Sequence, residues 1–144
     1  MPFRRRHLAR ILEIERASFG AEAWPREYFL EMYADCPELF LVGKASGRIA
    51  GYMITCVDGP AGKRAAEIAS LAVDPVYRRR GVAQALLSYS LNSLDRSGIQ
   101  RTVLMVRTGN AAGLALYRSF GFRRVRRARG YYEDGGDAFR MVRC

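Results

Sequence analysis

The residues best suited to chemistry lie where an apolar stretch ending at Val73 meets a helical pattern that opens at Gly81. The arginines Arg78–Arg80 fill the short turn between them. The first amides of a helix lack partners within it, and the helix dipole favours an anion at that end. Small side chains at Gly81 and Ala83 leave the backbone accessible, and neighbouring guanidinium groups bind phosphate well. The spacing indicates a phosphate-binding turn; a basic turn without a ligand is the alternative.

Several other chemistries are not supported by the sequence. The dinucleotide pattern Gly-x-Gly-x-x-Gly and the P-loop pattern are both absent. The single histidine, His7, lies in a basic leader, where a Ser-His-Asp triad is not expected. The cysteines Cys36, Cys56 and Cys144 are odd in number, widely spaced and without a C-x-x-C motif. We therefore expect neither a disulfide framework nor a zinc site.

Hydrophobic periodicity predicts the elements that must position this turn. We expect helices at 8–19, 25–35, 81–96 and 111–120, and strands at 39–45, 48–58, 67–73, 101–106, 122–129 and 137–143. Glycine-containing turns are expected at 46–47 and 59–62. This order predicts an α/β (mixed α+β) fold, in which helices flank a mixed sheet.

Size and charge limit the class of protein. The chain has 144 residues and a net charge of +10, and at roughly 100–200 residues per domain we expect one domain spanning 1–144. Only Lys44 and Lys63 among the 24 basic residues are lysine. The arginines suit phosphate or nucleic acid, and equally a solvated surface. No apolar run approaches the ~20 residues of a membrane helix, and no signal-type apolar stretch follows the N-terminal arginines, so we expect a soluble, cytoplasmic protein.

Three blocks of sequence carry a family resemblance. They are Arg78-x-x-Gly81-x-Ala83 after Leu71-Ala72-Val73, then Asn110-x-x-Gly113-x-x-Leu116-Tyr117-x-x-x-Gly121-Phe122, then Gly130-Tyr131-Tyr132-Glu133-Asp134-Gly135-Gly136-Asp137-Ala138. They resemble the acetyl-coenzyme-A signature, the Asn-x-x-Ala-x-x-Leu-Tyr segment and the closing hairpin of the GNAT N-acetyltransferases. The RimI-type (ribosomal-protein-alanine) and archaeal Ard1-like branch is the most similar. The resemblance covers nearly the whole chain. It implies the GNAT fold, a mixed and mostly antiparallel sheet with about four helices, and an acetyl-CoA-dependent N-acetyltransferase.

The resemblance implies acetyl-CoA as co-substrate and implies no metal. Its pantetheine arm is expected along the backbone at Leu71 and Val73, and its pyrophosphate on the amides from Arg79 to Gln84. Asn110 matches a pantetheine-contacting asparagine and is equally suited to cap a helix. The cofactor-binding residues implied are Leu71, Ala72, Val73, Arg78, Arg79, Arg80, Gly81, Val82, Ala83, Gln84 and Asn110.

The same resemblance assigns catalytic roles. Tyr117 lies two helical turns after Asn110 on roughly the same face and is expected to protonate the departing thiolate; a buried structural tyrosine is the alternative. RimI-type relatives commonly have a Glu where this chain has Met105. Because a thioether accepts no proton usefully, Glu67 on the neighbouring strand is expected to act as the base, with solvent as the other candidate. An ion-paired, purely structural Glu67 is the alternative.

The expected acceptor is the N-terminal α-amine of a protein such as a ribosomal protein. Aromatic side chains at Trp24, Tyr28 and Tyr131 are expected to bind it. One alternative is a small-molecule amine. The other is a catalytically weakened basic module that binds the ribosome or nucleic acid, since five arginines lie between 123 and 129. We expect a protein or peptide N-terminus as the partner rather than nucleic acid.

Overall fold

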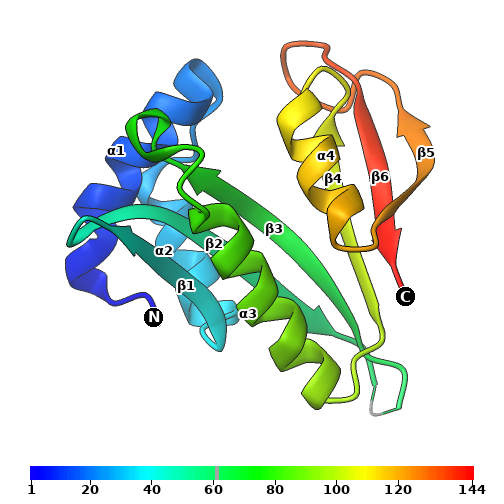
Figure 1. The fold of residues 1–144 in the computed structure, drawn as a ribbon. Helices are drawn as coiled ribbons and strands as arrows, with labels where there is room; N and C mark the ends of the chain where they lie inside the picture. The colour runs from blue at the N-terminus through cyan, green and yellow to red at the C-terminus, as the bar shows by residue number, and fades with distance from the viewer. Residues whose placement is uncertain (61) are drawn as a thin grey trace. The chain divides into compact units, whose positions relative to one another are not determined.

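The computed structural model describes residues 1–60 and 62–144, which form four α-helices and six β-strands (Figure 1). The helices are α1 (Leu8–Phe19), α2 (Arg26–Asp35), α3 (Val82–Arg96) and α4 (Ala111–Ser119). The strands are β1 (Leu39–Ala45), β2 (Arg48–Asp58), β3 (Ala65–Val73), β4 (Arg101–Arg107), β5 (Arg123–Ala128) and β6 (Ala138–Arg143). The predicted order of elements is confirmed. The turn predicted at 59–62 includes residue 61, which lies outside the described residues.

The strands form one mixed sheet in the order β1-β2-β3-β4-β6-β5. The pairs β1–β2, β4–β6 and β5–β6 are antiparallel. The β3–β4 pair is parallel, and its ladder joins Ala65–Ile68 to Arg101–Leu104. The predicted mixed, mostly antiparallel sheet is therefore confirmed.

The chain divides into two compact units. The N-terminal unit comprises Met1–Cys56 and Ala69–Asn92, and the C-terminal unit comprises Val57–Ile68 and Ser93–Cys144. The expectation of one domain over 1–144 stays a prediction.

In the N-terminal unit, β1 and β2 have helices on both faces (Figure 1). Phe40 on β1 and Tyr52 on β2 are fully buried on the face that carries the core shared with α1 and α2. The opposite face packs against α3. The contact is close there, since a Cβ atom at Gly43 would lie 3.0 Å from a Val82 methyl group. A Cβ at Gly51 would lie 2.8 Å from the carbonyl oxygen of Ala72, so only glycine permits this close approach of β2 to the end of β3.

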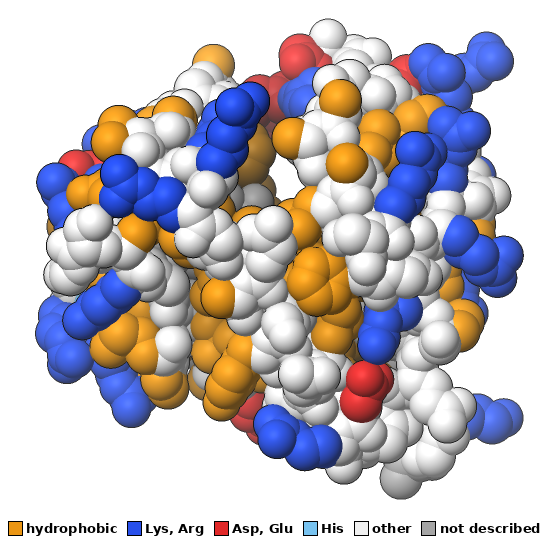
Figure 2. Space-filling view, viewed as in Figure 1, with side chains coloured by type: hydrophobic (Ala, Val, Ile, Leu, Met, Phe, Trp, Pro, Cys, Tyr) orange, Lys and Arg blue, Asp and Glu red, His pale blue; other side chains and the backbone are white. Residues whose placement is uncertain are grey.

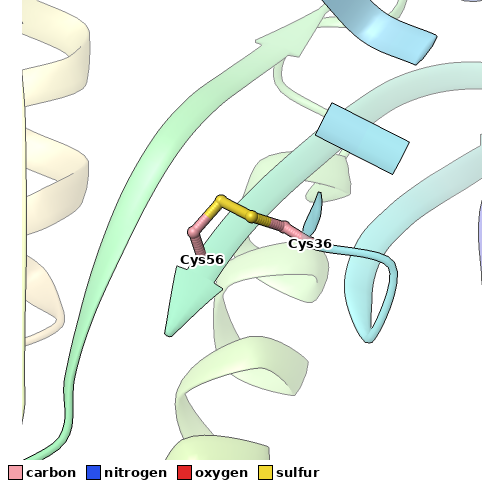
Figure 3. The surroundings of a disulfide bond; sticks show 2 residues. All are labelled: Cys36 and Cys56. Carbon is pink, nitrogen blue, oxygen red and sulfur yellow. A yellow bond between two sulfur atoms is a disulfide. The ribbon is translucent and has the colours of Figure 1, made fainter. Parts of the chain in front are cut away.

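A disulfide bond joins Cys36, just after α2, to Cys56 in β2 (Figure 3). The expectation of no disulfide is therefore wrong. The two cysteines are 20 residues apart, and packing of α2 on the sheet brings their Cα atoms to 5.2 Å, within the range that a disulfide spans. Sequence spacing carries no such information. Cys144 is free and exposed.

In the C-terminal unit, Thr102, Leu104 and Val106 of β4 are buried at alternate positions. Arg143 on β6 donates to the carbonyl oxygen of Phe120 and pairs with Asp95 at 3.2 Å. Among residues 1–60 and 62–144, no helix is both long and apolar enough to cross a membrane.

Candidate active site

The turn that follows β3 is fixed by Asp74. Its carboxylate accepts the backbone N–H of Val76 at 3.0 Å and pairs with Arg10 from α1 at 2.6 Å. The backbone N–H of Asp74 donates to Ala50 on β2 at 2.7 Å. The bond from Arg10 and the N–H of Val76 lower the pKa of Asp74, so the carboxylate stays ionised. The turn is thus held by both a helix and a strand.

The arginine-rich part of the turn is open to solvent. Arg78, Arg79, Arg80 and Gly81 are exposed, and the backbone turns through positive φ angles at Arg79 (65°) and Gly81 (78°). Around the position of a Cβ at Gly81, the one neighbour within 4 Å among the described residues is the Gln84 amide oxygen, at 3.8 Å. Figure 2 shows how Lys and Arg side chains are spread over one face of the molecule.

The start of α3 offers donors to an anion. The carbonyl oxygen of Gly81 accepts from Ala85 at 3.0 Å, while helix geometry leaves the N–H groups of Val82, Ala83 and Gln84 without acceptors inside the helix. Arg80 is held at the rim by Ser46 at 3.1 Å and by the Tyr77 ring. This cluster of amides and guanidinium groups suits a diphosphate.

The last residues of β3 lie beside this turn. Leu71 and Val73 are half-buried and Ala72 is buried. All three lie outside the ladder that joins Ala65–Ile68 to β4. The Arg78 side chain donates to the Val73 carbonyl oxygen at 3.3 Å. The predicted cofactor-binding residues from Leu71 to Gln84 are thus contiguous within the N-terminal unit.

Asn110 and Tyr117 belong to the C-terminal unit and to the same helix. The Asn110 side-chain oxygen accepts the N–H of Gly113 at 2.9 Å, so its helix-capping role is present in the structure. Tyr117 is buried and packs edge-on against Phe122. Burial, together with nearby Tyr132, raises the pKa of Tyr117 to about 12, so the phenol remains protonated across the physiological range.

Glu67 lies opposite Val103 in the β3–β4 ladder and is exposed. Residues two apart on a strand share a face, so Met105 lies on the same face as Val103 and Glu67. Met105 in turn pairs with Arg140 on β6. The side chain of Glu67 makes no hydrogen bond or ion pair among residues 1–60 and 62–144. The catalytic role of Glu67 stays a prediction.

The predicted acceptor-binding aromatics belong to two ring pairs, one in each unit. In the N-terminal unit, the rings of Trp24 and Tyr28 lie 4.4 Å apart, and Tyr28 is 42% exposed. In the C-terminal unit, Tyr131 is 53% exposed and contacts Tyr132 edge-on. Arg107 stacks 4.0 Å from the Tyr132 ring centroid.

The arginines of β5 are exposed. Two of them contact their own hairpin: Arg127 pairs with Asp137 at 2.8 Å, and Arg124 lies over the Phe139 ring. These contacts favour a solvated surface for both side chains.

Sequence reasoning missed one buried polar residue, Glu15, which is 1% exposed on α1. Its carboxylate accepts the backbone N–H of Trp24 at 2.9 Å and the hydroxyl of Tyr52. Burial raises the pKa of Glu15, and these two hydrogen bonds oppose that shift. The sequence did indicate that Glu15 is buried, because it lies four residues after Ile11 on the apolar stripe of α1.

Comparisons with known proteins identify the family. The model of the acetyltransferase (GNAT) family matches residues 8–122. An N-alpha-acetyltransferase of Saccharolobus solfataricus is 30% identical, over 92% of this chain and 84% of that protein. The N-alpha-acetyltransferase RimI of Mycobacterium tuberculosis is 36% identical, over 93% and 84%. The crystal structure of the NatC complex bound to Gag peptide and CoA superposes with a TM-score of 0.85 at 26% identity, over 99% of this chain and 94% of that one. The chain belongs to the GNAT acetyltransferase family, so it is an enzyme with the fold that its sequence implied.

Proposed function

We propose that this enzyme transfers an acetyl group from acetyl-CoA to the N-terminal α-amine of a protein, a ribosomal protein being one member of that class. The observation that carries the proposal is the exposed turn Arg78–Gly81, which leads directly into the first turn of α3, where the amides of Val82–Gln84 lack acceptors inside the helix. The named activity of the relatives and the CoA and peptide in the NatC complex support it.

The donor is proposed to bind along the N-terminal unit. Its pyrophosphate accepts hydrogen bonds from the amides of Val82–Gln84 and pairs with Arg78–Arg80, while its pantetheine arm lies along the backbone of Leu71–Val73. Asn110 adds a further contact through the amide nitrogen, which its capping bond to Gly113 leaves available.

The reaction is a direct displacement. The neutral amine attacks the thioester carbonyl, a C–N bond forms and the C–S bond breaks. The proton lost by the amine passes through water to Glu67 or directly to solvent. The Tyr117 hydroxyl donates its proton to the departing thiolate, as its protonated state allows.

The acceptor preference follows from the chemistry of amines. An α-amine has a pKa near 7.7–8.0 and a lysine side chain about 10.4, so much more of the α-amine is neutral at pH 7. We propose that Trp24, Tyr28 and Tyr131 bind the first residues of the peptide. A cytoplasmic location belongs to the same proposal, because protein N-termini first become available where chains are synthesised.

Thiol release from acetyl-CoA tests the proposal over matched acceptors: peptides with a free N-terminus, the same peptides blocked but carrying lysine, and small amines. Turnover is expected with free N-termini and loss of turnover on blocking. Equal turnover on blocked, lysine-bearing peptides would contradict the proposal. Turnover on small amines alone would favour the small-molecule alternative, and no turnover together with RNA binding would favour the nucleic-acid module.

A further inference from the structure

A buried hydrogen-bond chain runs through the core of the N-terminal unit. The Tyr52 hydroxyl donates to one oxygen of Glu15, and the backbone N–H of Trp24 donates to the other at 2.9 Å. The Tyr52 oxygen also lies 2.8 Å from the Ser70 hydroxyl. A phenol has one proton to donate. Ser70 therefore donates to Tyr52, Tyr52 donates to Glu15, and Trp24 donates to Glu15 from the other side.

Packing holds the members of this chain in place. The Phe29 ring lies edge-on to Tyr52 at 5.5 Å and also contacts Trp24. Ile11 and Ile14, four residues and one residue before Glu15 on α1, are fully buried. Ser18, one turn further along α1, lies outside this hydrogen-bond chain, and its buried hydroxyl has no hydrogen-bond partner among residues 1–60 and 62–144.

Stability alone does not account for a carboxylate at this position. Burying a charged group costs several kcal/mol, and apolar residues of similar volume often serve a core equally well or better. The hydrogen-bond chain instead fixes the orientation of a backbone group, the N–H of Trp24. Apolar packing alone would not orient this group. Residues that break the apolar pattern of a core, as a buried glutamate does, are found mainly at functional sites.

The two ends of this hydrogen-bond chain lie next to the two segments that are proposed to bind the acceptor and the donor. Trp24 lies just before α2, and its ring contacts that of the exposed Tyr28 at a tilt; these two residues are proposed to bind the acceptor. Ser70 directly precedes Leu71, where the proposed pantetheine-binding backbone begins. We propose that Glu15 is a positioning residue, which through Trp24 and Tyr52 holds the acceptor-binding segment in register with strand β3. This inference rests on the proposed function.

Three variants distinguish a positioning role of the Glu15 side chain from a role of its negative charge. Glu15→Ala removes both acceptors. Glu15→Gln keeps the connections, because the amide oxygen accepts from Trp24 while the amide nitrogen donates to Tyr52, which then donates to Ser70. Tyr52→Phe breaks the link to Ser70 but leaves the bond between Glu15 and Trp24. Glu13→Ala is the matched control, since Glu13 is exposed on the same helix.

The first measurement needs no substrate. Trp24 is the only tryptophan of the chain, so its emission maximum and its quenching by acrylamide report on the anchored segment. We expect Glu15→Ala to shift the emission to the red and to raise quenching, while Glu15→Gln, Tyr52→Phe and Glu13→Ala resemble the parent. An unchanged Trp24 signal in a folded Glu15→Ala protein would overturn the anchoring.

The second measurement is steady-state kinetics with a peptide that the parent acetylates. Loss of a hydrogen bond to a charged group predicts that Glu15→Ala raises the peptide KM about 10-fold or more, with kcat much less affected. Glu15→Gln should restore KM to within about 3-fold. A Glu15→Gln enzyme with a peptide KM as high as that of Glu15→Ala across pH 6.5–9 would refute positioning, because the charge itself would then matter. A parent that acetylates no peptide refutes the proposed function instead, while the fluorescence measurement still decides whether Glu15 anchors Trp24.

Discussion

Met105 stands where the resemblance to RimI-type enzymes implies a glutamate, so proton removal in the proposed reaction must use another group. Glu67 shares a face of the β3–β4 pair with Met105 and is exposed to solvent. Exposure allows its carboxylate to act through water. A peptide α-amine is partly neutral at pH 8. We therefore expect the base to accelerate the reaction without being essential for it.

We predict that Glu67→Gln lowers kcat about 10–100-fold at pH 7, at or below the lower end of the roughly 10²–10⁴-fold typical of general-base catalysis. Much of the loss should be recovered by pH 9, because the amine then loses its proton without help. Glu38→Gln, another exposed glutamate, is the control. The pH dependence of kcat is the measurement, and an unchanged rate from pH 6.5 to 9 would remove Glu67 from the mechanism. Met105→Glu, placed beside Arg140, should raise activity at pH 7.

Tyr117 should behave differently. Because its pKa is raised to about 12, it holds its proton throughout the working range, and its loss cannot be offset by raising the pH. Tyr117→Phe is therefore predicted to lower kcat about 10–100-fold at every pH between 6.5 and 9. Tyr89→Phe, on the exposed face of α3, should leave kcat unchanged. Recovery of the Tyr117→Phe enzyme at high pH would argue against an acid role.

At the scale of elements, the junction of β3, the arginine turn and α3 forms the proposed phosphate site. Acetyl-CoA should raise the melting temperature of the parent, because a ligand that binds the native state stabilises it. Gly81→Glu should abolish this shift by placing a carboxylate where phosphate binds. Gly98→Glu is the matched control, since Gly98 also has a positive φ and open space around it. Equal shifts in both variants would place the phosphate site elsewhere.

The turn should also depend on pH through Asp74. Its pKa is lowered in the folded state, so its contribution to stability is full above the ordinary aspartate pKa and is lost as the pH falls through the folded value. We predict that Asp74→Asn lowers the free energy of unfolding by about 1–3 kcal/mol at pH 7, as expected for a hydrogen bond to a charged group. The difference should shrink toward pH 3 in denaturant titrations. A difference that stays constant with pH would show that ionisation of Asp74 is irrelevant.

At the scale of the whole molecule, the Cys36–Cys56 disulfide is the one covalent link between distant positions among the described residues. A bond that closes a loop of this length typically stabilises by about 3 kcal/mol. A Cys36→Ser, Cys56→Ser double variant should therefore unfold at lower denaturant concentration than the parent, and reduction should bring the parent to the same midpoint. Cys144→Ser should change nothing. A midpoint insensitive to reduction would mean that the bond contributes no net stability.

The sequence by itself determined the order of elements, and it placed the arginine-rich turn at Arg78–Gly81, for which we predict anion binding, directly before a helix. Both depend on local rules, because hydrophobic periodicity and helix-start chemistry involve residues a few positions apart. It also indicated the family through three ordered blocks.

Only the tertiary structure decided which distant residues meet. It joined Cys36 to Cys56, enclosed Glu15 between Trp24 and Tyr52, and set Glu67 and Met105 on one face of the β3–β4 pair. Strand register and the packing of α1 and α2 on the sheet fix these contacts. A periodic pattern shows which side of a helix or strand is buried, but the partners buried against it depend on how separate elements pack.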